Sequence, residues 1–136
     1  MELFYEEKEI ELPIYHGTIV FIDSNDIGKI NERHKLDAKR EPFASAYENY
    51  KKLDDGSTQT YYLIVCNSKT KLDFTVGSVA HECFHITNFI FENRGIKADL
   101  NNDEPQAYLL EYLMDIAYGF YFAKKTTEAF AHALSE

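Results

Sequence analysis

The stretch that decides the fold is Phe74–Arg94, which reads FTVGSVAHECFHITNFIFENR. Its apolar residues recur at spacings of three and four, which is typical of a helix with one buried face. Gly95 follows, and glycine is preferred just past a helix C-terminus. The sequence therefore predicts a helix from about Phe74 to Arg94.

Within this helix, residues 81–85 read HECFH, which is the H-E-x-x-H pattern. At about 100° per residue, His81 and His85 project from one side of the helix and can bind one metal ion. Glu82 is placed to reach a water molecule on that metal. The composition gives only about 0.02 chance occurrences of the pattern in this chain. We therefore expect two histidine ligands and a catalytic carboxylate.

A helical wheel separates the histidines from the core. One direction holds the apolar set Val76, Val79, Ala80, Cys83, Thr87 and Ile90, and the opposite direction holds His81, His85, Asn88 and Glu92. The alternative to a metal site is an ordinary polar stripe on an amphipathic helix. Because Cys83 falls on the apolar side, it is predicted to be a buried thiol and not a ligand.

A second helix is predicted from Glu104-Pro105 to about Ala123, because proline is favoured in the first helical turn. A polar stripe recurs along it at spacings of four, three and four, and Leu109, Leu113, Ile116 and Phe120 occupy the other side. The stripe consists of Glu104, Tyr108, Glu111 and Asp115. It is either a solvated face or a face turned toward the histidines.

Catalytic zinc usually takes three protein ligands, so a third must come from outside the first helix. Glu104 is the predicted third ligand, with Asp103 and Glu111 as alternatives. If the stripe faces the histidines, Glu111 or Asp115 accepts the outward N–H of a ligating imidazole. Tyr108 is expected to steady a ligand or to donate a hydrogen bond to the oxyanion.

The first half of the chain favours strands. Runs of β-branched and aromatic residues over Glu9–Pro13 and Thr18–Ile22 predict a hairpin or a broken strand pair. A short helix is expected to follow through His34, with N-caps offered by Asp23–Asn25. Tyr61–Cys66 is apolar on both sides and rich in strand-forming residues, which predicts a buried strand.

Length and charge limit the classes of function. A chain of 136 residues is one domain, and its 14 Lys and Arg against 23 Asp and Glu give a net charge of −9. Such acidity disfavours nucleic acid and anionic membranes as partners. The start is acidic, unlike a signal peptide, and no apolar run approaches the roughly 18 residues of a membrane span. Two cysteines, Cys66 and Cys83, are expected to be reduced thiols, so we predict a cytoplasmic protein.

The chain resembles the gluzincin class of zinc metallopeptidases, and more closely the small zincins encoded by phages and other mobile elements. The likeness lies within about Thr75–Tyr118 and rests on H-E-x-x-H, then Gly95, then Asp103-Glu104-Pro105-x-Ala107-Tyr108-Leu109. The resemblance implies Zn²⁺ ligands at His81, His85 and Glu104. It implies Glu82 as the catalytic carboxylate.

The predicted fold class is α+β, a minimal zincin-like domain over residues 1–136. A small antiparallel sheet is expected to pack against the motif helix, with the second helix alongside. The resemblance also implies a strand beside the motif helix that pairs with extended peptide substrates, a role for which Tyr61–Cys66 is the candidate.

The leading functional prediction is a zinc metallopeptidase acting on a peptide or protein, with a metal-activated water and Glu82 as general base. One alternative is a metal-binding module without turnover, for example a mobile-element factor that binds a host protein. Another is a metal-free interaction domain. The remaining histidines, His16, His34 and His132, are interpreted as surface or hydrogen-bonded residues. A further short helix is expected at Thr126–Leu134.

Overall fold

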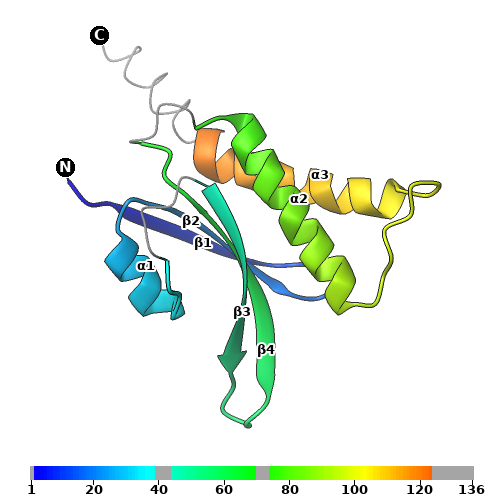
Figure 1. The fold of residues 1–136 in the computed structure, drawn as a ribbon, viewed down its shortest axis with the longest axis horizontal. Coiled ribbons are helices and arrows are strands. Elements are labelled where there is room, and N and C mark those ends of the chain that lie inside the picture. Colours follow the sequence, from blue (N-terminus) through cyan, green and yellow to red (C-terminus); the bar gives the residue numbers. More distant parts are fainter. Residues whose placement is uncertain (1, 39–43, 70–73, 124–136) are drawn as a thin grey trace.

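A computed structural model describes residues 2–38, 44–69 and 74–123, which form a four-stranded sheet with helices on both faces (Figure 1). The predicted α+β class is confirmed. The helix predicted at Thr126–Leu134 and His132 lie outside the described residues. In chain order, the elements are β1 (Tyr5–Glu11), β2 (Thr18–Ser24), α1 (Ile27–His34), β3 (Ala44–Lys52), β4 (Thr58–Cys66), α2 (Val76–Asn93), α3 (Glu104–Tyr118) and a π-helical turn, η1 (Gly119–Ala123).

The sheet has the order β1-β2-β4-β3 and is mixed. The β1–β2 and β3–β4 hairpins are antiparallel, but β2 and β4 pair in parallel. The prediction of an antiparallel sheet is therefore wrong for this central pair. The reason is the crossover through α1, which brings the second hairpin back to the sheet with β4 beside β2 and running in the same direction.

The two central strands separate two apolar clusters. Side chains of β2 and β4 that include Phe21 and Ile64 pack under α2 and α3. The opposite side chains, among them Val20 and Leu63, pack with Ile30 of α1. Because β4 is covered on both faces, the prediction of a buried strand at Tyr61–Cys66 is confirmed.

The helix that carries the motif has the predicted extent. Thr75 caps its start by accepting a hydrogen bond from the Ser78 amide, and Gly95 follows its end with φ 68°. The second predicted helix divides into α3 and η1. The hydroxyl of Tyr121 in η1 lies 2.9 Å from the carbonyl oxygen of Ile22 and 3.0 Å from that of Ile64, which fixes this turn to both central strands.

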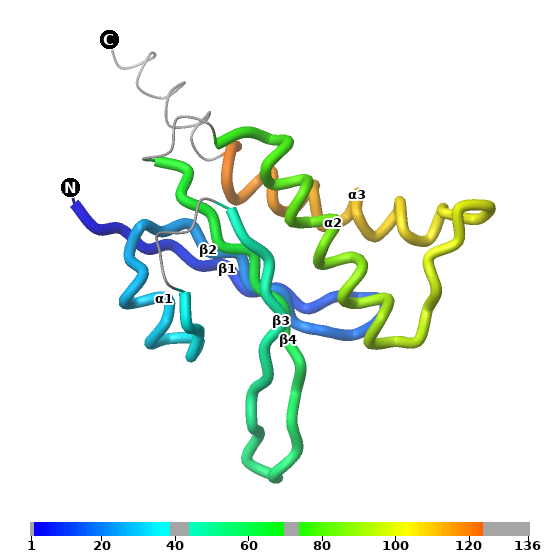
Figure 2. The backbone as a smooth tube through the Cα atoms, viewed as in Figure 1, coloured from blue at the N-terminus to red at the C-terminus, as the bar shows by residue number. Residues whose placement is uncertain are grey.

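The short helix α1 begins one residue later than expected. Asp26 is the N-cap and accepts a hydrogen bond from the Lys29 amide, because Asp23 and Ser24 belong to β2. The β3–β4 hairpin is longer than the part of β4 that pairs with β2, so its turn end extends beyond β2. Figure 2 shows this hairpin projecting away from the helices. Part of the α1 face therefore stays open.

Candidate metal centre

The two motif histidines meet on the outer face of α2. Their Nε2 atoms lie 3.1 Å apart, and the rings cross at 78° with centroids 4.8 Å apart. Two imidazole nitrogens bound to one tetrahedral zinc ion stand about 3.3 Å apart, given bonds of about 2.0–2.1 Å. The side chain of His81 is 68 % exposed, so an ion can reach it from solvent. This pair therefore fits two positions of a zinc site.

The ring of His85 is held from one side by an aromatic neighbour. It stacks on Phe89 with an interplanar angle of 21° and a centroid distance of 6.5 Å. Phe89 in turn packs against the apolar cluster beneath α2. This stacking limits the orientation of one candidate ligand before any ion binds.

Glu82 lies beneath the histidines and is buried, with 8 % of the residue exposed. Its Oε1 is 3.9 Å from Nε2 of His81. The backbone N–H of Ala46 lies near the carboxylate and lowers its pKa. Burial raises the pKa of Glu82, and the nearby histidines offset only part of this. A carboxylate with a raised pKa accepts protons more readily near neutral pH, which suits a general base.

The contact with Ala46 identifies the strand beside the motif helix as β3. Because β3 pairs with β4 on one side only, every second residue of β3 turns its backbone groups away from β4. Asn93 at the end of α2 donates a hydrogen bond of 3.2 Å to the Glu48 carboxylate. β3 is an edge of the sheet, whereas β4 is paired on both sides. The assignment of Tyr61–Cys66 as the substrate-pairing strand is therefore wrong.

The predicted third ligand is not beside the histidines. Glu104 is the first residue of α3, and it lines a groove with the β1–β2 loop that includes Leu12 and Tyr15. Within residues 2–38, 44–69 and 74–123, no three His, Cys, Asp or Glu side chains come together closely enough to hold a metal ion. Asp103, the residue before α3, and Glu111 do not complete such a group either.

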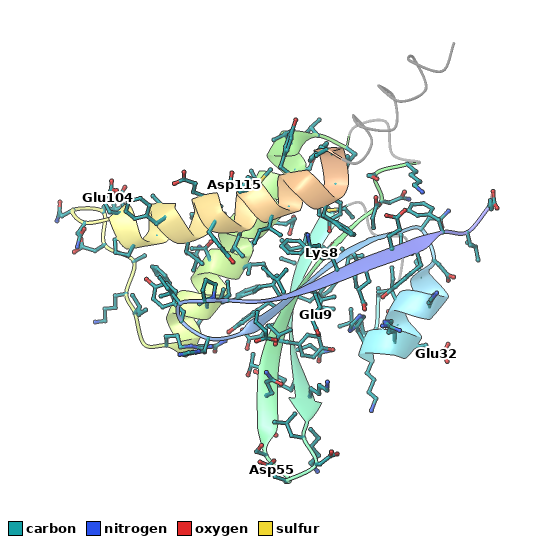
Figure 3. The ribbon with its side chains drawn as sticks, turned by 180° about the vertical axis from the view of Figure 1, so that it is seen from behind. Lys8, Glu9, Glu32, Asp55, Glu104 and Asp115 are labelled. Atoms are coloured by element: carbon teal, nitrogen blue, oxygen red, sulfur yellow. The ribbon has the colours of Figure 1, made fainter. Side chains whose placement is uncertain are left out.

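Helix packing explains this placement. Gln106 donates a hydrogen bond of 2.7 Å to Asn88, so α3 begins against the C-terminal half of α2. Leu109 and Leu113 turn the apolar side of α3 to the core. The polar stripe must then face outward. Figure 3 labels Glu104 and Asp115 on the outer side of α3.

The remaining stripe residues are exposed as well. Tyr108 is 65 % exposed and lines the same groove as Glu104. In the described part of the chain, neither Glu111 nor Asp115 hydrogen-bonds to an imidazole of the motif. The predicted roles of these three residues at the histidines are not supported, and the structure has the solvated face that the sequence left as an alternative.

Both cysteines are buried free thiols, as predicted. Cys83 faces the core, and burial raises its pKa to about 12. Burial also raises the pKa of Cys66. A thiol with so high a pKa stays protonated near neutral pH and does not act as a metal ligand without a large change in its surroundings.

A second carboxylate–histidine contact, which the sequence did not reveal, lies on the other face of the sheet. His34 is buried, with Nε2 2.7 Å from Oε1 of Glu7 and Nδ1 3.2 Å from the hydroxyl of Tyr61. The interpretation of His34 as a hydrogen-bonded residue is confirmed. Its partners lie 27 positions away in either direction, so no fixed spacing marks the contact.

No family model, curated protein or solved structure matches the chain. Among the described helices, none has the length and apolar character to cross a bilayer. The case for a function therefore rests on the geometry of the candidate site.

Proposed function

We propose that the protein is a zinc-dependent peptide hydrolase in which His81 and His85 bind the metal and Glu82 is the general base. The single observation that carries this proposal is the 3.1 Å separation of the two Nε2 atoms above a buried carboxylate. A structural zinc site has no use for such a carboxylate, because it closes all four positions with ligands.

Zinc bound at such a site lowers the pKa of a water molecule toward about 7 and polarises a carbonyl oxygen. Glu82 takes a proton from the attacking water and later donates it to the amine that leaves. Overall, one water is consumed, the peptide C–N bond breaks, and a carboxylic acid and an amine form. The raised pKa of Glu82 favours the first transfer, in which the carboxylate accepts a proton.

The substrate class follows from the neighbouring edge strand. Among the described strands, β3 has a neighbour on one side only, so its outer edge can pair with an extended peptide, as exposed sheet edges do. A peptide added there lies near Glu82, because Ala46 of β3 is close to that carboxylate. The two free thiols support a reducing, cytoplasmic location for the reaction.

The test is cleavage of a peptide library by the purified protein, with a chelator as control. Glu82→Gln is expected to keep zinc bound while kcat falls by about 10²–10⁴-fold. His85→Ala is expected to lose both zinc and cleavage. Full cleavage by Glu82→Gln would overturn the assignment of the general base.

A second candidate function is a metal-binding module without hydrolysis, which binds another protein through the same face. The observation that favours it is that the described residues bring no third ligand to the histidines. Stoichiometric zinc without cleavage of any library member would support this candidate. Zinc content near zero after zinc addition would contradict both candidates.

A further inference from the structure

A second cleft lies on the α1 face of the sheet, away from the motif histidines. It has a volume of about 490 Å³ and is lined by residues of all four strands and of the end of α1. α1 has only eight residues and leaves part of this face uncovered. A cleft of this volume is within the range of sites that bind small molecules.

Positive charge gathers in this cleft. The structure describes nine of the chain's 14 Lys and Arg residues, and four of the nine line it: Arg33, Lys35, Lys51 and Lys52. Two carboxylates also line it, those of Glu7 and Glu9, so the formal charge is 4 − 2 = +2. Glu9, which Figure 3 labels, belongs to the β1 wall. A positive cleft in a chain of net charge −9 is unlike the rest of its surface.

The charge of Glu7 is already neutralised within the wall. Arg33 binds its carboxylate with Nε at 3.1 Å and a terminal nitrogen at 2.9 Å, and His34 contacts it at 2.7 Å. In contrast, the described residues include no ion-pair partner for Lys35, Lys51 or Lys52. The three ammonium groups are therefore available to an anion from solution.

One of these lysines sits in a strained backbone conformation. Lys35 has φ 52° and ψ 43°, in the left-handed region where glycine or asparagine is usual. A lysine there costs about 1 kcal/mol or more relative to those residues. This conformation ends α1, where the Lys35 amide donates a hydrogen bond to the carbonyl oxygen of Asn31, and the residue is exposed.

Neutral hydrogen-bonding groups line the cleft between the cations, and they are held in place. The hydroxyl of Tyr61 in the lining accepts a hydrogen bond of 3.0 Å from Asn49, which is outside the lining and also donates to the carbonyl oxygen of His34 at 2.5 Å. Gln59 lies 3.4 Å from the hydroxyl of Thr18. Such fixed groups orient a polar ligand at low entropic cost.

We propose that this cleft binds a small polyanion that carries phosphate or carboxylate groups, with Lys35 and Lys51 as its main charge partners. Both groups are multiply charged oxygen acceptors, which lysine ammonium groups bind. Lys52 follows Lys51 in β3, so its side chain points to the opposite face of the strand. The proposal does not depend on the zinc site, because the two sites lie on opposite faces of the sheet.

Isothermal titration with two small anions tests the proposal. Inorganic pyrophosphate represents phosphate ligands, and tricarballylate represents carboxylate ligands. At least one is expected to bind with Kd of about 1 mM or tighter. Lys35→Gln/Lys51→Gln is expected to weaken binding about tenfold, whereas the matched control Lys8→Gln/Lys97→Gln changes it less than about twofold. The anion that binds identifies the source of the ligand group.

Three results would overturn the proposal. The first is that neither anion binds. The second is that the control substitutions weaken binding as much as the cleft substitutions do. The third is that binding disappears in His81→Ala/His85→Ala, which would show that the anion binds to a metal ion at the histidines. Circular dichroism of each variant verifies the fold. The substituted lysines are exposed, so we expect no loss of structure.

Discussion

Glu82 and Glu7 are both carboxylates beside histidines, on opposite faces of one sheet, yet their pKa values move in opposite directions. Burial raises the pKa of Glu82, because its polar neighbours compensate only in part. Burial alone would also raise the pKa of Glu7. Hydrogen bonds from Arg33, Tyr5 and His34 outweigh burial and lower that pKa to about 2.

This difference separates a reactive arrangement from a structural one. The histidine beside Glu7 is buried and binds the carboxylate directly, so both groups are occupied. The histidines above Glu82 are exposed and contact each other, so their nitrogens remain accessible. Availability of the donor atoms, and not the presence of a carboxylate–histidine contact, favours the α2 site for chemistry.

The largest expected effect is on zinc affinity. It is tested by substituting one histidine on each face of the sheet. His85→Ala should lower zinc affinity by about 100-fold or more, because it removes half of the paired nitrogens. His34→Ala should leave zinc affinity within about twofold but lower the free energy of unfolding by about 2 kcal/mol, because half-buried Glu7 and Tyr61 lose a partner. Zinc titration and urea unfolding of both variants measure this. Weaker zinc binding by His34→Ala would break the distinction between the two faces.

The next effect is acid sensitivity through Glu7. Its folded pKa lies below the ordinary 4.5, so its contribution to stability is complete above that value and is lost as the pH falls toward about 2. A shift of this size sets an upper limit of about 3 kcal/mol, which exposure of Arg33 to solvent reduces to about 1–2 kcal/mol. Urea unfolding between pH 6 and pH 3 should show that Glu7→Gln lacks this contribution. If the difference in stability between wild type and variant does not change with pH, the lowered pKa of Glu7 is contradicted.

A smaller effect of opposite sign is expected at Glu82. Since its folded pKa is raised, the carboxylate destabilises the protein above its ordinary pKa, and the penalty disappears on acidification. In zinc-free protein, Glu82→Gln should therefore raise the free energy of unfolding at pH 7 by less than about 1 kcal/mol and change it little at pH 4. Calorimetric Tm values at the two pH values measure this. A lower Tm for the variant at pH 7 would contradict this expectation, because it would show that the charged carboxylate of Glu82 stabilises the fold.

The smallest effect is expected at Glu104. Because this side chain is exposed at the start of α3, Glu104→Ala should change zinc affinity less than about twofold and stability by less than about 0.5 kcal/mol. The same zinc titration as for His85→Ala measures it. A loss of about 100-fold would instead show that Glu104 reaches the histidines when zinc binds, as the gluzincin resemblance implies.

Features set by neighbouring residues were predictable. The extent of α2, the convergence of His81 and His85, and the core position of Cys83 all follow from helical spacing, and the structure has each of them. The outward direction of the α3 stripe was also present in the sequence, because Leu109 and Leu113 require the opposite side to be buried.

Features set by distant segments were not predictable. The neighbours of a strand depend on how the two hairpins pair in the sheet. The local sequence pattern therefore does not show that β4 is an interior strand and β3 an edge strand. The four cations of the second cleft come from the end of α1 and the end of β3, which are separated along the chain. The sequence alone therefore gives no sign that these two groups of cations meet in space.

By itself, the sequence determined a helix that carries two histidines and a glutamate at metal-binding spacing, since a rotation of about 100° per residue is a local property of the backbone. Only the tertiary structure decided that β3 covers the glutamate, that Glu104 lies elsewhere, and that lysines gather on the opposite face. These relations depend on how distant apolar surfaces are buried together, which local spacing does not specify.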